Sequence, residues 1–327
     1  MKYGNLKLAI SSSPHAHSKN STAVIMRDVC IALLPALFAA IYFFGMRALW
    51  MTVVSSLACV VFEWGYRHFM KKDSTVSDWS AVVTGMLIAF VCPVSLPYWA
   101  LIIGDFFAIV VVKQLFGGIG MNIVNPALAA RAFCFSWPTL MSGSAFHVTD
   151  GALDGMTSAT PMEALAAGNL PSQSLLDLFL GKVGGSFGEV SALALILGGI
   201  YLLVRKVITA RIPLAYLLTV AVLAFAFPIG GNSRLDWMGY QLLSGGLMLG
   251  AIFMATDYTT SPVTHGGQIA FGIGCGVLTI ALRYFGSYVE GVSYAILIMN
   301  CCVGFFDKIG IPKRFGLVKK KKGGEAK

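Results

Sequence analysis

The chain has 327 residues, of which 57% are hydrophobic and only 12% are charged. Soluble globular domains usually carry about 25% charged residues, so this composition excludes an ordinary soluble protein and predicts a polytopic membrane protein. A net charge of +9 would also suit a nucleic-acid-binding protein, but the positions of the basic residues fit orientation in a bilayer better, and we expect no nucleic-acid partner.

Residues 1–27 form a polar tail without the apolar core and small-residue cleavage site of a signal peptide. Beyond this tail, apolar stretches recur that approach the length of about 20 residues that a membrane-spanning helix needs. The closest of them are separated by turns rich in Pro or Gly. Ten segments are predicted, at 28–45, 48–69, 79–97, 98–116, 121–138, 189–204, 212–228, 238–255, 267–285 and 290–306.

Two stretches of these segments, 78–126 and 236–295, look like diverged copies of one another. Each begins with Asp-Trp and continues through a small-residue patch, a break at Pro and a Gly-rich entry into a last helix. Small residues also occur wherever membrane helices pack closely, which is the simpler explanation. If the copies are real, each half has five helices, and an odd number requires the halves to be inverted relative to one another.

The sequence therefore predicts an all-α membrane protein of about ten transmembrane helices, arranged as two inverted five-helix repeats. The first repeat covers 28–138 and the second covers 189–307. A polar loop, 139–188, separates them, and a basic tail, 308–327, follows.

Basic residues fix the expected orientation. Most of the 24 Lys and Arg residues fall on one side of the predicted segments, together with both ends of the chain. Because cytoplasmic loops carry the excess of Lys and Arg, we expect both termini in the cytoplasm and the 139–188 loop outside. Lys319 to Lys322 act as part of this signal, although anionic lipid is an alternative partner for them.

The outward loop contains the polar run 154–161, Asp-Gly-Met-Thr-Ser-Ala-Thr-Pro. Pro161 fixes its own φ angle and favours extended backbone at Thr160, so the Thr160 hydroxyl is expected to be accessible for modification. The alternative is that the loop is a plain connector.

Two charges fall within predicted membrane segments, where charges are rare and informative. Asp105 lies seven residues into its segment and Arg131 lies seven residues before Pro138. Both depths are about 10 Å below the outer surface at 1.5 Å per helical residue, so a buried pair is geometrically possible. It would be either part of an ion or proton path, or a structural pair that locks two helices.

Other polar residues are weaker candidates. Glu63, Glu290 and Asp257 lie near segment ends, and His15 and His17 lie in the polar tail. The seven cysteines have neither CxxC spacing nor a nearby His cluster, so no metal site is predicted.

Asn122 and Asn125 precede the fifth segment. They would either face a polar ligand at the start of this helix or simply cap it. No Ser-His-Asp set, phosphate loop or dinucleotide fingerprint is present, so no complete active site is expected in this chain alone.

The motif Asp154-x-x-Thr157-Ser158-Ala159-Thr160 resembles the flavin-attachment signature of the RnfD/NqrB family, whose members belong to ion-translocating oxidoreductases. Ser158 departs from the commoner Gly, but both are small and we expect attachment to survive. The resemblance covers nearly the whole chain, and the short N-terminus favours the RnfD branch. Supporting similarities are Ser13-Pro14-His15, Ile25 to Val29, Ala32 to Pro35, Lys113 to Gly118, Asn125-Pro126-Ala127 and Arg131-Ala132-Phe133.

The resemblance implies a membrane electron-transfer subunit of an Rnf-type ferredoxin:NAD oxidoreductase, coupled to Na⁺ or H⁺ movement across the cytoplasmic membrane of a bacterium or archaeon. It implies FMN joined through its phosphate to Thr160 by a flavin transferase that acts outside this membrane. Other Rnf proteins, including the flavin-bearing RnfG, would be partners. The family also suggests a second flavin, such as riboflavin, bound without a covalent bond between the repeats, in a pocket that the sequence does not identify.

Two alternatives remain at this point. One is a solute channel or transporter built on the same inverted repeat, with no covalent flavin. The other is the NqrB-type subunit of a Na⁺-pumping NADH:quinone oxidoreductase.

Overall fold

The structure, a computed structural model, describes residues 21–141, 147–149, 152–154, 160–286 and 291–310. These residues are mostly helical. The helices are α1 (Thr22–Phe44), α2 (Met46–Phe69), η1 (Val76–Asp78), α3 (Ser80–Phe90), α4 (Tyr98–Phe106), η2 (Phe107–Gln114), α5 (Pro126–Cys134), α6 (Pro138–Met141), α7 (Pro161–Ala166), α8 (Leu175–Leu180), α9 (Ala192–Val204), α10 (Arg211–Ala226), α11 (Arg234–Leu243), α12 (Leu247–Leu249), η3 (Gly250–Met254), α13 (His265–Phe285), α14 (Val292–Cys301) and α15 (Val303–Phe306).

Each of the ten predicted segments overlaps at least one of these helices. Helices α1, α2 and α13 are long and apolar enough to cross a membrane, and α11 with α12 and η3 forms a further candidate that is bent by 63°. Helices α3, α9, α10 and α14 are apolar but shorter. The chain is thus a multi-pass membrane protein whose shorter apolar helices fall below the length of a full span.

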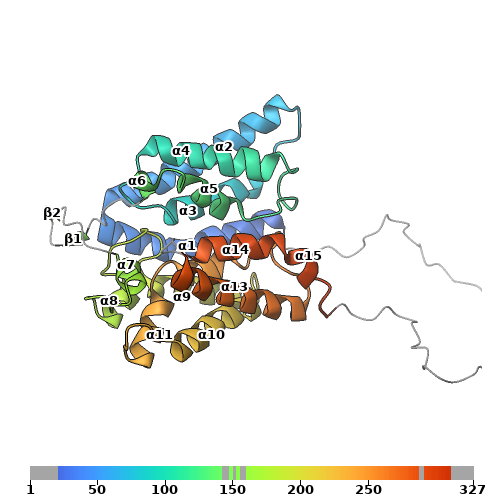
Figure 1. Ribbon diagram of the computed structural model, residues 1–327. Helices are drawn as coiled ribbons and strands as arrows, with labels where there is room; N and C mark the ends of the chain where they lie inside the picture. Colours follow the sequence, from blue (N-terminus) through green and yellow to red (C-terminus); the bar gives the residue numbers. More distant parts are fainter. Residues whose placement is uncertain (1–20, 142–146, 150–151, 155–159, 287–290, 311–327) are drawn as a thin grey trace, which may run out of the picture.

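The helices gather into two groups on either side of α1 (Figure 1). Helices α2 to α6 form one group, and α9 to α15 form the other. Helix α1 contacts α2 and α3 in the first group and α9 in the second, while α5 contacts α14. The helices of the first and fifth predicted segments therefore pack against those of the sixth and tenth.

The α1–α9 contact depends on a close backbone approach. A Cβ on Gly198 of α9 would lie 2.1 Å from the carbonyl oxygen of Ala32 on α1. At the same crossing, Arg205 donates from Nη2 to buried Asp28 Oδ2 at 2.9 Å. Only glycine permits this separation, and the ion pair joins the two helices near one end.

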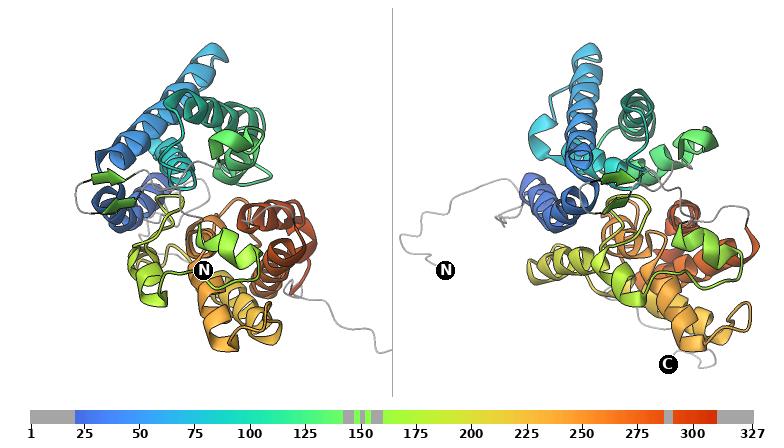
Figure 2. Two further views of the ribbon diagram at one scale, coloured as in Figure 1. Left: turned by 60° about the vertical axis from the view of Figure 1, so that its left-hand side comes forward. Right: turned by 90° about the vertical axis from the view of Figure 1, so that its left-hand side faces the viewer.

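The predicted loop between the halves has local structure of its own. Strands β1 (His147–Thr149) and β2 (Ala152–Asp154) form an antiparallel hairpin, and α6, α7 and α8 are short helices. Strand β1 lies beside α1 (Figure 2). This hairpin, α7 and α8 lie at the end of the molecule opposite α15 (Figure 1).

Candidate functional site

Thr160 is held in place by a reciprocal cap at the start of α7. Its Oγ1 accepts a hydrogen bond from the Glu163 backbone N–H at 3.4 Å, and Glu163 Oε2 accepts one from the Thr160 N–H at 3.0 Å. Pro161 occupies the first helical position, where its missing N–H costs no hydrogen bond. The Thr160 backbone is extended, as predicted, at φ −63° and ψ 151°.

The rest of the predicted attachment motif is only partly described. Asp154 is the last residue of β2. Thr157, Ser158 and Ala159 lie outside the described residues.

Thr160 borders a pocket of about 390 Å³, counting its open mouth. We call it the Thr160 pocket. Its lining comes from α7, the segment before α9 and the break between α11 and α12. The lining residues are Thr160, Pro161, Met162, Leu178, Val183, Gly184, Gly185, Ser186, Glu189, Val190, Leu243, Ser244, Gly245 and Gly246.

Two glycines shape the Thr160 pocket. Gly245 and Gly246 have φ angles of +68° and +67°, in the left-handed region where glycine meets no steric penalty. A Cβ on Gly246 would lie 2.4 Å from the Glu189 carboxylate, and one on Gly245 would lie 2.7 Å from Met162 Sδ. The break between α11 and α12 therefore brings bare backbone against the side chains of the pocket.

Arg283 of α13 supports this break from behind. Its buried guanidinium donates to the backbone oxygens of Gln241 at 2.6 Å and Ser244 at 2.9 Å, and to Gln241 Oε1 at 2.8 Å. These carbonyls are left free because the helix stops, so Arg283 satisfies groups that would otherwise be buried without a partner.

The pair expected between Asp105 and Arg131 does not form. Arg131 Nη1 instead lies 2.8 Å from Glu189 Oε1, and both side chains are buried. Asp105 Oδ1 instead lies 2.7 Å from Ser55 Oγ. Asp105 and Arg131 lie at equal depth along their helices, but two side chains pair only if they also point toward each other around the helix axes.

A second, larger pocket lies between the two groups of helices, with about 800 Å³ of space including its mouth. We call it the interface pocket. Polar side chains from both groups line it, together with apolar ones from α1, α3, α9 and η3. The polar lining residues are Ser80, Thr84, Lys113, Asn122, Asn125, Thr256, Asp257, Tyr258 and Thr259.

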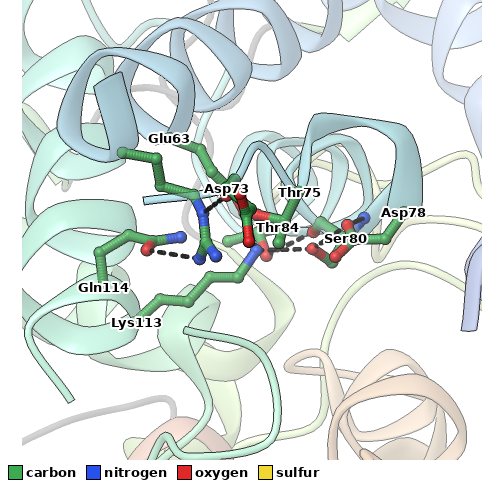
Figure 3. A network of polar contacts seen from close by, with 9 residues as sticks. Glu63, Asp73, Thr75, Asp78, Ser80, Thr84, Lys113 and Gln114 are labelled. Atoms are coloured by element: carbon green, nitrogen blue, oxygen red, sulfur yellow. Dashed lines mark hydrogen bonds and ion pairs between the residues drawn. The ribbon is translucent and has the colours of Figure 1, made fainter. Parts of the chain in front are cut away.

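The interface pocket meets a buried network around Lys113 (Figure 3). Lys113 Nζ contacts Glu63 Oε2 at 2.7 Å and Ser80 Oγ at 2.6 Å. Thr75 donates to the other Glu63 oxygen at 2.6 Å, and Ser80 donates to Asp78 Oδ1 at 2.6 Å. A chain of polar groups thus runs from the loop before α3 to the wall of the pocket.

The remaining predicted residues have the following places. Asn125 caps α5 by accepting from the Ala127 and Leu128 N–H groups, which confirms the capping interpretation, and it also borders the interface pocket. Asp257 borders the same pocket and accepts from Thr259 and Thr260. Burial raises the pKa of its carboxyl. Residues His15, His17, Glu290 and Lys319 to Lys322 lie outside the described residues.

Sequence reasoning did not identify three buried charged side chains beside the pockets. Glu189, Lys113 and Arg283 fall at the edges of predicted segments, yet each is part of a buried contact. Their partners lie 33 to 58 residues away in the chain, so no local pattern pointed to them. The Thr160–Glu163 cap did have a local signal, a Thr followed three residues later by Glu.

Comparisons with known proteins agree over nearly the full length. The sequence profile of the NQR2, RnfD, RnfE family matches residues 9–316. The chain is 47% identical to the D subunit of the Na⁺-translocating ferredoxin:NAD⁺ oxidoreductase complex of Acetobacterium woodii, covering 98% of this chain and 99% of that protein. It is 39% identical to the D subunit of the proton-translocating complex of Clostridium ljungdahlii, covering 94% and 96%. It is 36% identical to the D subunit of the ion-translocating oxidoreductase complex of Methanosarcina acetivorans, covering 94% and 96%.

Proposed function

The chain belongs to the NQR2, RnfD, RnfE family, and from this premise we propose that it is the D-type membrane subunit of an Rnf ferredoxin:NAD oxidoreductase. It carries electrons between partner subunits on the two sides of the bacterial inner membrane. The transfer is coupled to movement of Na⁺ or H⁺. This assignment is supported by the similarity to D subunits over nearly the full length of the chain.

We further propose that FMN is joined to Thr160 as a phosphoester. In this attachment the Thr160 Oγ1–P bond forms, the bond from phosphorus to the leaving group of the flavin donor breaks, and the hydroxyl proton is released. The observation that supports it is the position of the hydroxyl, which the Glu163 cap holds at the border of a pocket. A tethered flavin cannot be lost to water, and the protein's share of the chemistry is to position it.

The residues of the Thr160 pocket fit this group. Gly245 and Gly246 pack closely against Met162 and Glu189, and polar groups of Glu189 and Ser186 lie in the same wall. A flavin held there would supply the redox chemistry, while the chain keeps it oriented.

The second flavin is assigned to the interface pocket. This pocket is larger than the Thr160 pocket, and it combines an apolar wall with Lys113, Asn122 and Asn125 as polar contacts. It lies between the two groups of helices, as the family resemblance suggests for a second flavin. Lys113 donors and Asn side chains suit the carbonyl oxygens of such a ring.

The inverted-repeat layout and the orientation remain part of this proposal. Pairing of α1 with α9 and of α5 with α14 supports two repeats related by a two-fold axis. Each half also has a left-handed break, at Trp79 before α3 and at Gly245 and Gly246 before α12. The hairpin, α7 and α8, which are described parts of the 139–188 loop, lie at the end of the molecule opposite α15, which supports an outward loop when the C-terminal end is cytoplasmic (Figure 1).

In-gel flavin fluorescence tests the covalent link. Chain produced together with its flavin transferase should give a fluorescent band on a denaturing gel, and Thr160→Val should abolish it. Ser174→Ala is the matched control, because Ser174 caps α8 in the same loop with the same kind of reciprocal cap. A band that persists in Thr160→Val, or no band from the wild-type chain, would favour the alternative of a flavin-free channel or transporter.

A further inference from the structure

Asp105 is a buried acid that neither proposed flavin site uses. It is 0% exposed and lies where α4 changes into the π-helix η2. Ser55 and the Cys59 thiol face it from α2, and Cys134 approaches the same helix from α5. π-Helical turns are frequent at functional sites, so Asp105 is a candidate functional residue. What it could do depends on whether its carboxyl carries a proton.

The Ser55 hydroxyl has too few hydrogens for an ionised Asp105. Ser55 Oγ lies 2.7 Å from Asp105 Oδ1 and 2.9 Å from the Gly85 carbonyl oxygen. A hydroxyl has one hydrogen, whereas a carboxylate and a carbonyl can only accept. With ionised Asp105, one of these two short contacts would join two acceptors.

A proton on Asp105 resolves the conflict. Oδ1–H then donates to Ser55 Oγ, and the Ser55 hydroxyl donates to the Gly85 carbonyl. Oδ2 accepts no hydrogen bond from an N–H or O–H group among the described residues, and only the weak S–H donor of Cys59 lies beside the carboxyl; it becomes the carbonyl oxygen of a neutral acid. An unpaired neutral carbonyl costs much less in an apolar interior than an unpaired carboxylate oxygen.

The surrounding charges do not offset an ionised Asp105. Among the described residues, the ion pairs join Lys113 to Glu63, Arg131 to Glu189 and Arg205 to Asp28, and none includes Asp105. Lys113 and Arg131 do act on the neighbouring thiols of Cys59 and Cys92, but each is held by its own carboxylate. The groups next to Asp105 are the thiols of Cys59, Cys92 and Cys134. None of these thiols supplies a positive charge.

The short Ser55–Gly85 contact is imposed by packing. A Cβ on Gly85 would lie 2.6 Å from Ser56 Cα, so α2 and α3 touch through bare backbone at this level. Ser55 is fully buried at this level, with its Oγ 2.9 Å from the Gly85 carbonyl oxygen. The two acceptors therefore remain on either side of one hydroxyl.

We propose that Asp105 is a proton-binding site in which Oδ1 carries a proton and links α4 through Ser55 to Gly85 of α3. Loss of this proton leaves one hydroxyl hydrogen for two acceptors. Release therefore breaks a contact of Ser55, either with α3 or with α4. This site ties proton binding to helix contacts in the first group, and it does not depend on flavin at either pocket.

Infrared spectroscopy of the purified complex tests the proposal. The wild-type spectrum should contain a C=O stretch of a protonated carboxyl that shifts in D₂O and disappears in Asp105→Asn. The Asn amide can still donate to Ser55, so this variant should assemble with an unfolding midpoint close to that of the wild type. Loss of carboxylate bands instead, or no change in the protonated-carboxyl region, would overturn the proposal.

Ser55→Ala provides a second readout that does not remove the acid. It deletes the acceptor of the Asp105 proton, so the same C=O stretch should persist but move in frequency. Ser56→Ala is the matched control, because Ser56 is the next residue of α2 and should leave the band in place. If the Asp105→Asn variant does not accumulate, the Ser55→Ala spectrum alone tests the proposal. A protonated-carboxyl C=O band that does not move in Ser55→Ala contradicts the proposal.

Discussion

Lys113 and Glu63 lie 2.7 Å apart with side chains that are 4% and 1% exposed. Two such charges are costly to remove from water, and their attraction offsets that cost only while both are present. Hydrogen bonds from Thr75 to Glu63 and from Lys113 to Ser80 satisfy further polar atoms of the pair. The pair therefore matters most as a unit.

Removing only one member of the pair should destabilise the protein strongly. We expect Lys113→Met to lower the free energy of unfolding by about 3 to 5 kcal/mol, because it leaves Glu63 buried and uncompensated. Lys113→Met with Glu63→Gln should recover most of the loss. The unfolding midpoint of the purified complex at one fixed scan rate measures both variants. A single variant as stable as the wild type would contradict this role.

Residue-level contacts were only partly predictable from the sequence. The extended backbone at Thr160 follows from Pro161, and the cap of α5 follows from Asn125 before Pro126. Arg131 is buried as its position predicts, but its partner, Glu189, comes from a segment outside the helices. Sequence spacing gives depth along one helix and says nothing about which distant residue faces it.

At the scale of elements, the breaks in helices form the walls of the pockets. Helices α11 and α12 are separated by Ser244, Gly245 and Gly246, and the carbonyls at this break are bound by Arg283. The apolar pattern predicted one segment over 238–255, because hydropathy does not register a backbone turn. The same limit applies to 79–97, which holds only the eleven residues of α3 as regular helix.

Gly246→Ala tests whether the α11–α12 break shapes the Thr160 pocket. The new Cβ would be placed in left-handed backbone, at about 1 to 2 kcal/mol, and also 2.4 Å from the Glu189 carboxylate. We expect a lower unfolding midpoint and less flavin per chain on the denaturing gel.

Gly231→Ala is the control for this variant. Gly231 also has a left-handed φ angle, +72°, but no atom lies within 4 Å of the position of a Cβ. It should share the backbone strain and leave flavin attachment unchanged. Equal flavin loss in both variants would contradict a specific role for the α11–α12 break.

At the scale of the whole molecule, α1 and α9 hold two groups of helices around the interface pocket. That the chain is a multi-pass membrane protein was predictable from composition, because an apolar helix needs only a run of apolar residues. The assembly of the helices was not, because it depends on contacts such as Gly198 against Ala32 and Arg205 with Asp28. The interface pocket is made by both groups together.

Filling the interface pocket should displace a non-covalent flavin and spare the covalent one. Val29 lines the pocket from α1, so Val29→Trp should lower the flavin released by denaturation several-fold. Ile31→Trp is the matched control, since Ile31 is 41% exposed on the same helix and does not line the pocket. Quantifying released and retained flavin separately decides the matter, and equal release from both variants would place the second flavin elsewhere.

Attachment of FMN to Thr160 underlies the proposed role of the whole chain, and peptide mass spectrometry of the purified complex checks it without an intermediate assumption. The proteolytic peptide containing Thr160 should carry the added mass of FMN less one water, with fragment ions that place the adduct on Thr160. An unmodified Thr160 peptide from complex that is active in electron transfer would show that the flavin is not attached there.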